Sequence, residues 1–390
     1  MGPEALPLTR SSTGSLGVTS ISIVLLFMLP WVVGQPTDET QGQVLWSYPC
    51  GYCRVSISRD GALVAAGNPG VNGSVLYLFN TEGDQLWRSE FDGGIRSVSF
   101  SPDGGYLAVT EGPRVRLLDT QDGHGIWNFT TGDEAMSAQP SVDARYVIAG
   151  SRDRRIYLLN QTGSLITWVE TGAQVYSVSA TRGGELMVGS SKDGKAYVLT
   201  TDPPGLLGSV EIGGSLYDIA ASEDGRYAVA GSSDGSVALI DLQNVRIVSS
   251  FKAGEASTSV AISSNGSVAV AGSNDLKAYV FGETGASNWS FATRGAVYGT
   301  AISSEGRYVA VGSTDRKVYF FQSASSRPVW ISENISRINS LGMSADGSLI
   351  ATGTSGGVWL LRGRVVEVTP VALLVVIAAG LLRLSRSRPL

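Results

Sequence analysis

Few residues in this 390-residue chain have the types and spacing that chemistry needs. Cys50 and Cys53 form a C-x-x-C motif, which can serve as a structural disulfide, a redox pair or half of a zinc site. They are the only cysteines and His124 is the only histidine, so a zinc site would lack its second pair of ligands. We therefore expect a disulfide that stiffens a loop, with free thiols or a redox role as the alternatives.

Five aspartates stand in S-x-D turn sequences that recur along the chain. They are Asp153, Asp193, Asp234, Asp275 and Asp315. Turn-forming side chains follow the symmetry of a repeat, because every copy needs the same backbone hydrogen bonds, whereas an active site breaks that symmetry. The sequence therefore predicts structural aspartates and no catalytic, cofactor-binding or metal-binding residues.

The elements that position these residues repeat about every 40 residues. Trp46, Trp87, Trp127 and Trp168 follow one another at spacings of 41, 40 and 41 residues. Each repeat contains four short stretches of alternating β-branched and aromatic residues between Asp-Gly and Gly-rich turns, which is typical of strands. Eight such repeats predict an all-β, eight-bladed β-propeller of four-stranded blades, in which the segment 44–48 completes the eighth blade as its outer strand.

Two motifs carry a resemblance to known propellers. The S-E-D-G turn at Ser222–Gly225 resembles the turns of WD40 repeats, and the spacing of Asp119, Gly123 and Trp127 resembles the tryptophan-docking repeat of pyrroloquinoline-quinone-type propellers. The resemblance covers about residues 44–362 and implies the fold, but no single activity, because propellers host unrelated functions. It also implies that the tryptophans pack between blades.

The quinone-dependent dehydrogenases that this chain resembles use a Ca²⁺ shell of acidic and amide oxygens and long loops over the cofactor. Blades of about 40 residues leave little chain for such loops. We therefore expect no enzymatic activity and no cofactor, with a quinone-dependent dehydrogenase or another propeller enzyme as the alternative.

One position, in the loop that enters each innermost strand, changes from repeat to repeat while the core positions recur. Its residues are Cys53, Arg96, Met136, Tyr176, Tyr217, Thr258, Tyr298 and Asn339. We call the face that carries these loops the top face, and the opposite one the bottom face. We predict a partner-binding rim there, because tyrosine offers a large ring and a hydroxyl with little rotamer entropy to lose. The predicted rim is Arg96, Tyr176, Tyr217, Tyr298 and Asn339; rim residues without a partner are the alternative.

Both ends of the chain have features that are typical of membrane-associated segments. Residues 1–34 contain an apolar, uncharged stretch that predicts a signal peptide or an uncleaved anchor. Residues 365–382 predict a transmembrane helix, and the arginines of the tail 383–390 place the C-terminus in the cytoplasm by the positive-inside rule. The propeller, residues 35–364, would then lie outside the cytoplasm with its bottom face near the membrane.

Six N-x-S/T sequons agree with an extracytoplasmic propeller. They are Asn72, Asn128, Asn160, Asn265, Asn288 and Asn334. The net charge of −5 argues against nucleic-acid binding and favours cationic partners. We expect a single-pass cell-membrane protein, held by its C-terminal helix, that binds an unidentified protein or glycan at the cell surface. A cytoplasmic WD40-type scaffold is the second alternative.

Overall fold

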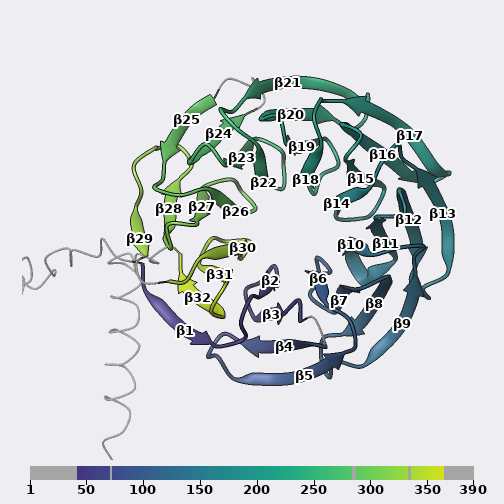
Figure 1. The fold of residues 1–390 in the computed structure, drawn as a ribbon, viewed down its shortest axis with the longest axis horizontal. Coiled ribbons are helices and arrows are strands. Elements are labelled where there is room, and N and C mark those ends of the chain that lie inside the picture. The colour runs from purple at the N-terminus through teal and green to yellow at the C-terminus, as the bar shows by residue number, and fades with distance from the viewer. Residues whose placement is uncertain (1–41, 71–72, 283–286, 333–334, 364–390) are drawn as a thin grey trace, which may run out of the picture. The chain divides into compact units, whose positions relative to one another are not determined.

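Four-stranded antiparallel sheets follow one another around a ring (Figure 1). The computed structural model describes residues 42–70, 73–282, 287–332 and 335–363, and within these residues 32 strands form eight sheets. The predicted eight-bladed propeller is therefore confirmed. The predicted terminal segments lie outside the described residues, and no helix within those residues is long and apolar enough to span a membrane.

Blades 1 to 4 each consist of four strands that are consecutive in the chain, from the innermost to the outermost. Their strands are β2 (Arg54–Ile57), β3 (Leu63–Gly67), β4 (Ser74–Asn80) and β5 (Gln85–Phe91); β6 (Ile95–Phe100), β7 (Tyr106–Glu111), β8 (Arg114–Asp119) and β9 (Gly125–Thr130); β10 (Ala135–Pro140), β11 (Tyr146–Ser151), β12 (Arg155–Asn160) and β13 (Leu165–Glu170); β14 (Val175–Ala180), β15 (Leu186–Ser191), β16 (Lys195–Thr201) and β17 (Pro204–Glu211). A short 3-10 helix, η2 (Val142–Ala144), joins β10 to β11.

Blades 5 to 8 continue the pattern, and β1 supplies the outer strand of blade 8. Their strands are β18 (Leu216–Ala221), β19 (Tyr227–Ser232), β20 (Ser236–Asp241) and β21 (Arg246–Lys252); β22 (Ser257–Ile262), β23 (Val268–Ser273), β24 (Lys277–Gly282) and β25 (Ser287–Ala292); β26 (Val297–Ile302), β27 (Tyr308–Ser313), β28 (Val318–Gln322) and β29 (Trp330–Ser332); β30 (Ile338–Met343), β31 (Leu349–Thr354), β32 (Val358–Arg362) and β1 (Val44–Tyr48).

The pairing of β1 with β32 joins the two ends of the described chain. The register places Trp46 opposite Leu360 and Tyr48 opposite Val358. Beyond the strands, the backbone N–H of Arg362 donates to the carbonyl of Gln43 at 2.8 Å. Residue 43 and residue 362 therefore lie side by side at the bottom face.

A buried hydroxyl ends every innermost strand. Its oxygen accepts the backbone N–H five residues further on, as from Tyr227 to Ser222 at 3.0 Å, which satisfies a buried donor in the turn to the second strand. The same bond recurs in all eight blades, at Ser58, Ser101, Ser141, Thr181, Ser222, Ser263, Ser303 and Ser344.

Tryptophans of the outer strands dock on the following blade. The indole N–H of Trp87 donates to the carbonyl of Thr120 at 2.9 Å, and a Cβ on Gly123 would lie 2.8 Å from the ring, so the close approach requires glycine, whose φ is +74°. The same indole bond is made by Trp46, Trp127, Trp289 and Trp330. The expectation that every tryptophan packs between blades was wrong for Trp168, whose ring is 41% exposed under the guanidinium of Arg155 at 4.2 Å.

The apolar core lies between neighbouring sheets. In one cluster, Leu76 and Leu78 of β4 pack with Ile95 of β6 and with Leu107 and Val109 of β7, all fully buried. Alternate residues of each strand face one of its two neighbouring blades, so both faces of a sheet are covered. The scaffold is consequently rigid up to the residues that line the central channel.

Candidate functional site

A β-bulge marks the predicted rim position in seven innermost strands. In β6, for example, Ile95 pairs with Glu111 and Ser97 with Thr110, which leaves Arg96 unpaired between them. The extra residues are Arg96, Met136, Tyr176, Tyr217, Thr258, Tyr298 and Asn339. A bulge re-aims its side chain away from the regular pleat. The sequence alignment thus found a set of geometrically equivalent positions.

These side chains surround the upper mouth of the central channel. A cavity of about 600 Å³, which we call the top cavity, is lined by all five residues of the predicted rim together with Met136 and Thr258. Cys53, at the corresponding position of blade 1, is fully buried instead. The next residue, Arg54, takes its place in the lining.

Three tyrosines form one side of the top cavity. The rings of Tyr176 and Tyr217 meet edge to face with centroids 6.0 Å apart, and Tyr217 is 37% exposed. The ammonium of Lys192 lies 4.8 Å from the centroid of Tyr176, and the guanidinium of Arg337 lies 5.5 Å from that of Tyr298. The tyrosines therefore present apolar ring surface bordered by cations.

Arginines line the opposite side, and a glutamate outside the lining pairs with two of them. Glu134 bridges two of them, with Oε1 2.6 Å from Nε of Arg96 and Oε2 2.6 Å from Nη1 of Arg152. Arg54 donates from Nη1 to the backbone carbonyl of Asn339 at 3.1 Å. The expected preference for cationic partners does not fit this mouth, which is locally basic in an acidic chain.

Asp218 lines the channel below the tyrosines and was missed in the sequence. Its carboxylate accepts the hydroxyl of Ser177 at 2.8 Å and the backbone N–H groups of Val260 at 2.9 Å and Ile219 at 3.0 Å. Burial raises the pKa of Asp218 above its usual value, because these bonds and the charge of Arg54 offset only part of the desolvation. The signal in the sequence is a break in a repeat, since five other innermost strands have serine at this position.

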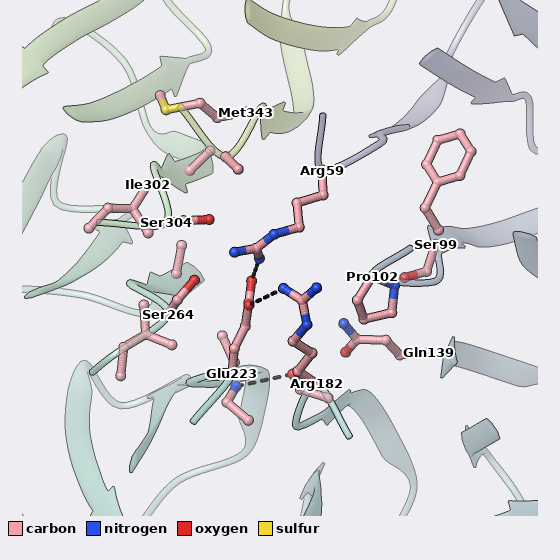
Figure 2. A pocket seen from close by; sticks show the side chains of 18 of the residues that line it. Arg59, Ser99, Pro102, Gln139, Arg182, Glu223, Ser264, Ile302, Ser304 and Met343 are labelled. Carbon is pink, nitrogen blue, oxygen red and sulfur yellow. Dashed lines mark hydrogen bonds and ion pairs between the residues drawn. The ribbon is translucent and has the colours of Figure 1, made fainter. Parts of the chain in front are cut away.

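An ion-pair cluster crosses the bottom of the channel (Figure 2). Arg59 of blade 1 reaches Glu223 of blade 5, on the opposite side of the ring, and Arg182 of blade 4 contacts the same carboxylate at 3.4 Å. Burial, and secondly the charge of Arg182, lower the pKa of Arg59. The pocket around this cluster has a volume of about 340 Å³ and is lined by residues of every blade. The cluster obstructs the channel at the bottom face.

Three family models match successive stretches of the chain. The model of outer membrane protein assembly factor BamB matches residues 71–203, that of the cytochrome D1 heme domain matches residues 186–283, and that of the WD domain, G-beta repeat, matches residues 287–322. The chain is a WD40- and PQQ-like repeat propeller. No curated protein matches it.

Neither channel cavity is lined by a histidine that could ligate a heme iron. His124, the only histidine, lies in the turn between β8 and β9, where its backbone carbonyl accepts the N–H of Asp119, and it is absent from the lining of both channel cavities. The carboxylate of Asp218, in the lining of the top cavity, is engaged by three donors, and that of Glu134, outside the lining, is engaged by two arginines. Among the described residues no three His, Cys, Asp or Glu side chains are placed to hold a metal ion.

The remaining predicted sites lie away from the channel. The structure joins Cys50 and Cys53 by a disulfide, and both side chains are buried at the entrance to blade 1. Among the sequons, Asn128, Asn265 and Asn288 are exposed and Asn160 is half-buried at the end of β12. The other two, Asn72 and Asn334, lie outside the described residues.

The turn aspartates accept hydrogen bonds from neighbouring groups of the turns, as expected of residues with a structural role. Asp193 accepts three hydrogen bonds within the top-face loops, from the N–H groups of Gly172 and Lys195 and from the hydroxyl of Tyr197. The corresponding aspartate–tyrosine bonds recur at Asp153, Asp275 and Asp315. Asp234 lacks it, because Ala238 replaces the tyrosine.

Proposed function

We propose that this propeller is a membrane-anchored, extracytoplasmic and non-enzymatic platform that holds a protein partner in its top cavity. The observation that carries the proposal is the contrast between a repeated scaffold and a bulge position that differs from blade to blade. All seven bulge side chains line one cavity. Variable side chains on a rigid frame are the usual basis of partner recognition.

Two further observations support the direction of approach. The ion pair between Arg59 and Glu223 obstructs the channel from below, so a segment that enters the top cavity does not pass through to the bottom face. The family that matches residues 71–203 bears the name of an assembly factor, and we propose the same kind of role here, a surface that binds another protein.

The orientation rests on the sequence and on one contact. Residues 365–382 are predicted to cross the membrane, and the strand before them ends at Arg362 beside Gln43, at the bottom face. Both predicted membrane-related segments would therefore leave from the bottom, and the top cavity would face away from the membrane. The exposed sequons favour an extracytoplasmic propeller.

One observation favours the enzyme alternative, namely the match of residues 186–283 to the model of the cytochrome D1 heme domain. It is tested by adding heme, or pyrroloquinoline quinone with Ca²⁺, to the purified full chain. A ligand held at 100 times its Kd would stabilise the fold by about 2.7 kcal/mol. We expect no shift in melting temperature. A saturable rise with either cofactor would favour the enzyme alternative over the platform.

Site-specific photo-crosslinking in intact cells tests the platform itself. A photoreactive amino acid is placed at Thr258 in the top cavity and, in a second strain, at Glu305 in an exposed bottom-face turn. We expect a discrete crosslinked protein from position 258. Its yield should fall at least tenfold when Tyr176, Tyr217 and Tyr298 are all replaced by serine, because hot-spot tyrosines supply much of an interface's affinity.

The matched control replaces three bottom-face residues, Asp122, Glu305 and Arg307, by serine, and should leave the yield unchanged. Crosslinking from position 305 that is lost when Asp122 and Arg307 are replaced by serine, with none from position 258, would place the partner on the bottom face and refute the proposal.

A further inference from the structure

The top cavity concentrates positive charge in an acidic protein. Three arginines line it, and two more cations lie over its tyrosines; these are Arg54, Arg96, Arg152, Lys192 and Arg337. Among the described residues, Asp218 is the one carboxylate in the lining and Glu134 pairs with Arg96 and Arg152 beside it, while the chain as a whole has a net charge of −5. The charge of this mouth is therefore local, and an anionic group would find complementary charge here.

Unsatisfied donors give a second, independent indication. The side chain of Asn339 is 6% exposed, lines the top cavity and leaves Nδ2 without a hydrogen-bond partner. Nε of Arg152, which also lines this cavity, is buried and without a partner as well. Buried donors without partners are costly, so an acceptor that a ligand brings to either of these donors would stabilise the complex.

The surroundings of the cavity limit the size of that ligand. The turn aspartates lie in the loops between second and third strands, on the same top face but farther from the axis. They lie on blades 3 to 7 and form an arc of carboxylates beside the basic mouth, which repels a long polyanion lying across that part of the face. A short segment can enter the cavity inside this arc, and the Arg59–Glu223 pair obstructs the channel below it.

We propose that the top cavity binds a short acidic segment of the protein partner, with one or two Asp or Glu carboxylates placed between the arginines and Asn339. Neighbouring apolar side chains of the segment pack on Tyr176, Tyr217 and Tyr298. This inference rests on the proposed function and adds the chemical class of the partner to it.

Selection from a phage-displayed library of random 12-residue peptides, on the full chain reconstituted in nanodiscs, tests the inference. Empty nanodiscs remove peptides that bind lipid. We expect the enriched peptides to carry Asp or Glu next to apolar residues. Synthetic versions with Asn and Gln in place of the carboxylates should bind at least tenfold more weakly, and binding should weaken as salt rises from 50 to 300 mM, the usual result of screening.

Two cavity variants and a matched control locate the site. Arg96→Gln and Arg337→Glu change exposed side chains, so folding should be retained, and each should weaken the acidic peptide at least fivefold. Arg226→Gln and Arg307→Gln, on exposed bottom-face turns, should leave the affinity unchanged. An acidic peptide that is sensitive only to the bottom-face variants would overturn the inference.

The outcomes separate this inference from the proposed function. Enrichment of neutral or basic peptides whose binding needs the three tyrosines would overturn the proposal of an acidic segment. It would not contradict the proposed platform function. Heparin binding that needs Arg96, with no enriched peptide, would assign the cavity to a sulfated glycan and overturn a protein segment. Enrichment of no peptide above the empty nanodiscs would also overturn the inference, whereas the platform is judged by crosslinking alone.

Discussion

Replacing Asp193 by alanine should destabilise the propeller far more than replacing Asp234 at the equivalent position. The Asp193 carboxylate accepts the N–H of Gly172 at 2.7 Å, that of Lys195 at 3.0 Å and the hydroxyl of Tyr197 at 2.6 Å. Tyr197 is only 7% exposed, so its hydroxyl gains little from water after the substitution.

The size of the loss in unfolding free energy follows from the number of hydrogen bonds that each substitution removes. A hydrogen bond to a charged group contributes about 1.5–3 kcal/mol, less where water can replace the partner. We take about 3 kcal/mol for Asp193→Ala. Asp234 accepts the N–H of Ser236 at 2.9 Å and a long contact from Lys252 at 3.5 Å, so Asp234→Ala should cost about 1 kcal/mol.

Thermal unfolding of the full chain in detergent, followed by tryptophan fluorescence, provides the measurement. An unfolding entropy of about 2.1 cal/mol/K per residue over roughly 320 residues converts these energies to melting shifts of about 4–5 °C and 1–2 °C. Asp193→Asn, which keeps one acceptor oxygen, should fall between wild type and Asp193→Ala. Equal shifts at Asp193 and Asp234 would refute the argument that the bonds from Gly172 and Tyr197 make Asp193 the more stabilising of the two.

Further outcomes concern docking, alkaline pH and topology. Trp87→Ala should lower the free energy of unfolding by about 3 kcal/mol and Trp168→Ala by under 1 kcal/mol, because only Trp87 is docked on its neighbour; equal costs would contradict this. Burial, with a neighbouring aspartate, raises the pKa of Tyr197 and of Tyr279 to about 12. Below pH 10, the pKa of tyrosine in the unfolded chain, these phenols contribute their full stabilisation to the fold. This contribution disappears as the pH rises through 12, their pKa in the folded chain. Absorbance at 295 nm should show a late titration step whose amplitude falls in Tyr197→Phe and in Tyr279→Phe, with a remainder because burial also raises the pKa of Tyr157. An unchanged late step in both variants would contradict this assignment. Protease added to intact cells should digest the propeller and spare a tag after Leu390; a digested tag would reverse the proposed orientation.

The fold could be predicted because its determinants are local and repeated. Asp-Gly turns, alternating strands and the tryptophan spacing recur in many copies of the same repeat. An error in assigning the strands of one copy therefore does not change the predicted number of blades. Trp168 shows the limit of this reasoning. Its sequence context matches the other copies, but docking depends on the turn of the following blade, where residues 202–205 are Asp-Pro-Pro-Gly in place of the glycine turn used by Trp87.

The candidate site could be predicted only in part. Tyr176, Tyr217 and Tyr298 were found because their position varies within a repeat, although the bulge that aims them was not foreseen. Asp218 could have been found in the same way, as a carboxylate in a row of serines. Arg59 and Glu223 could not, because 164 residues separate them and only the closed ring places blade 1 opposite blade 5.

Ring closure explains why recognition should concentrate at the axis of this molecule. A position that occurs once per blade is spread over the whole circumference when it lies on an outer strand, but on the innermost strands its copies converge on one cavity. Substitutions at such a position leave the interblade core and the turn hydrogen bonds untouched, because those rest on other residues. A repeat can therefore hold its scaffold positions constant for stability while one bulge position per blade is altered to fit a ligand. In this chain that position combines tyrosine, arginine and asparagine around a single mouth, which is the composition that an acidic, partly apolar segment requires.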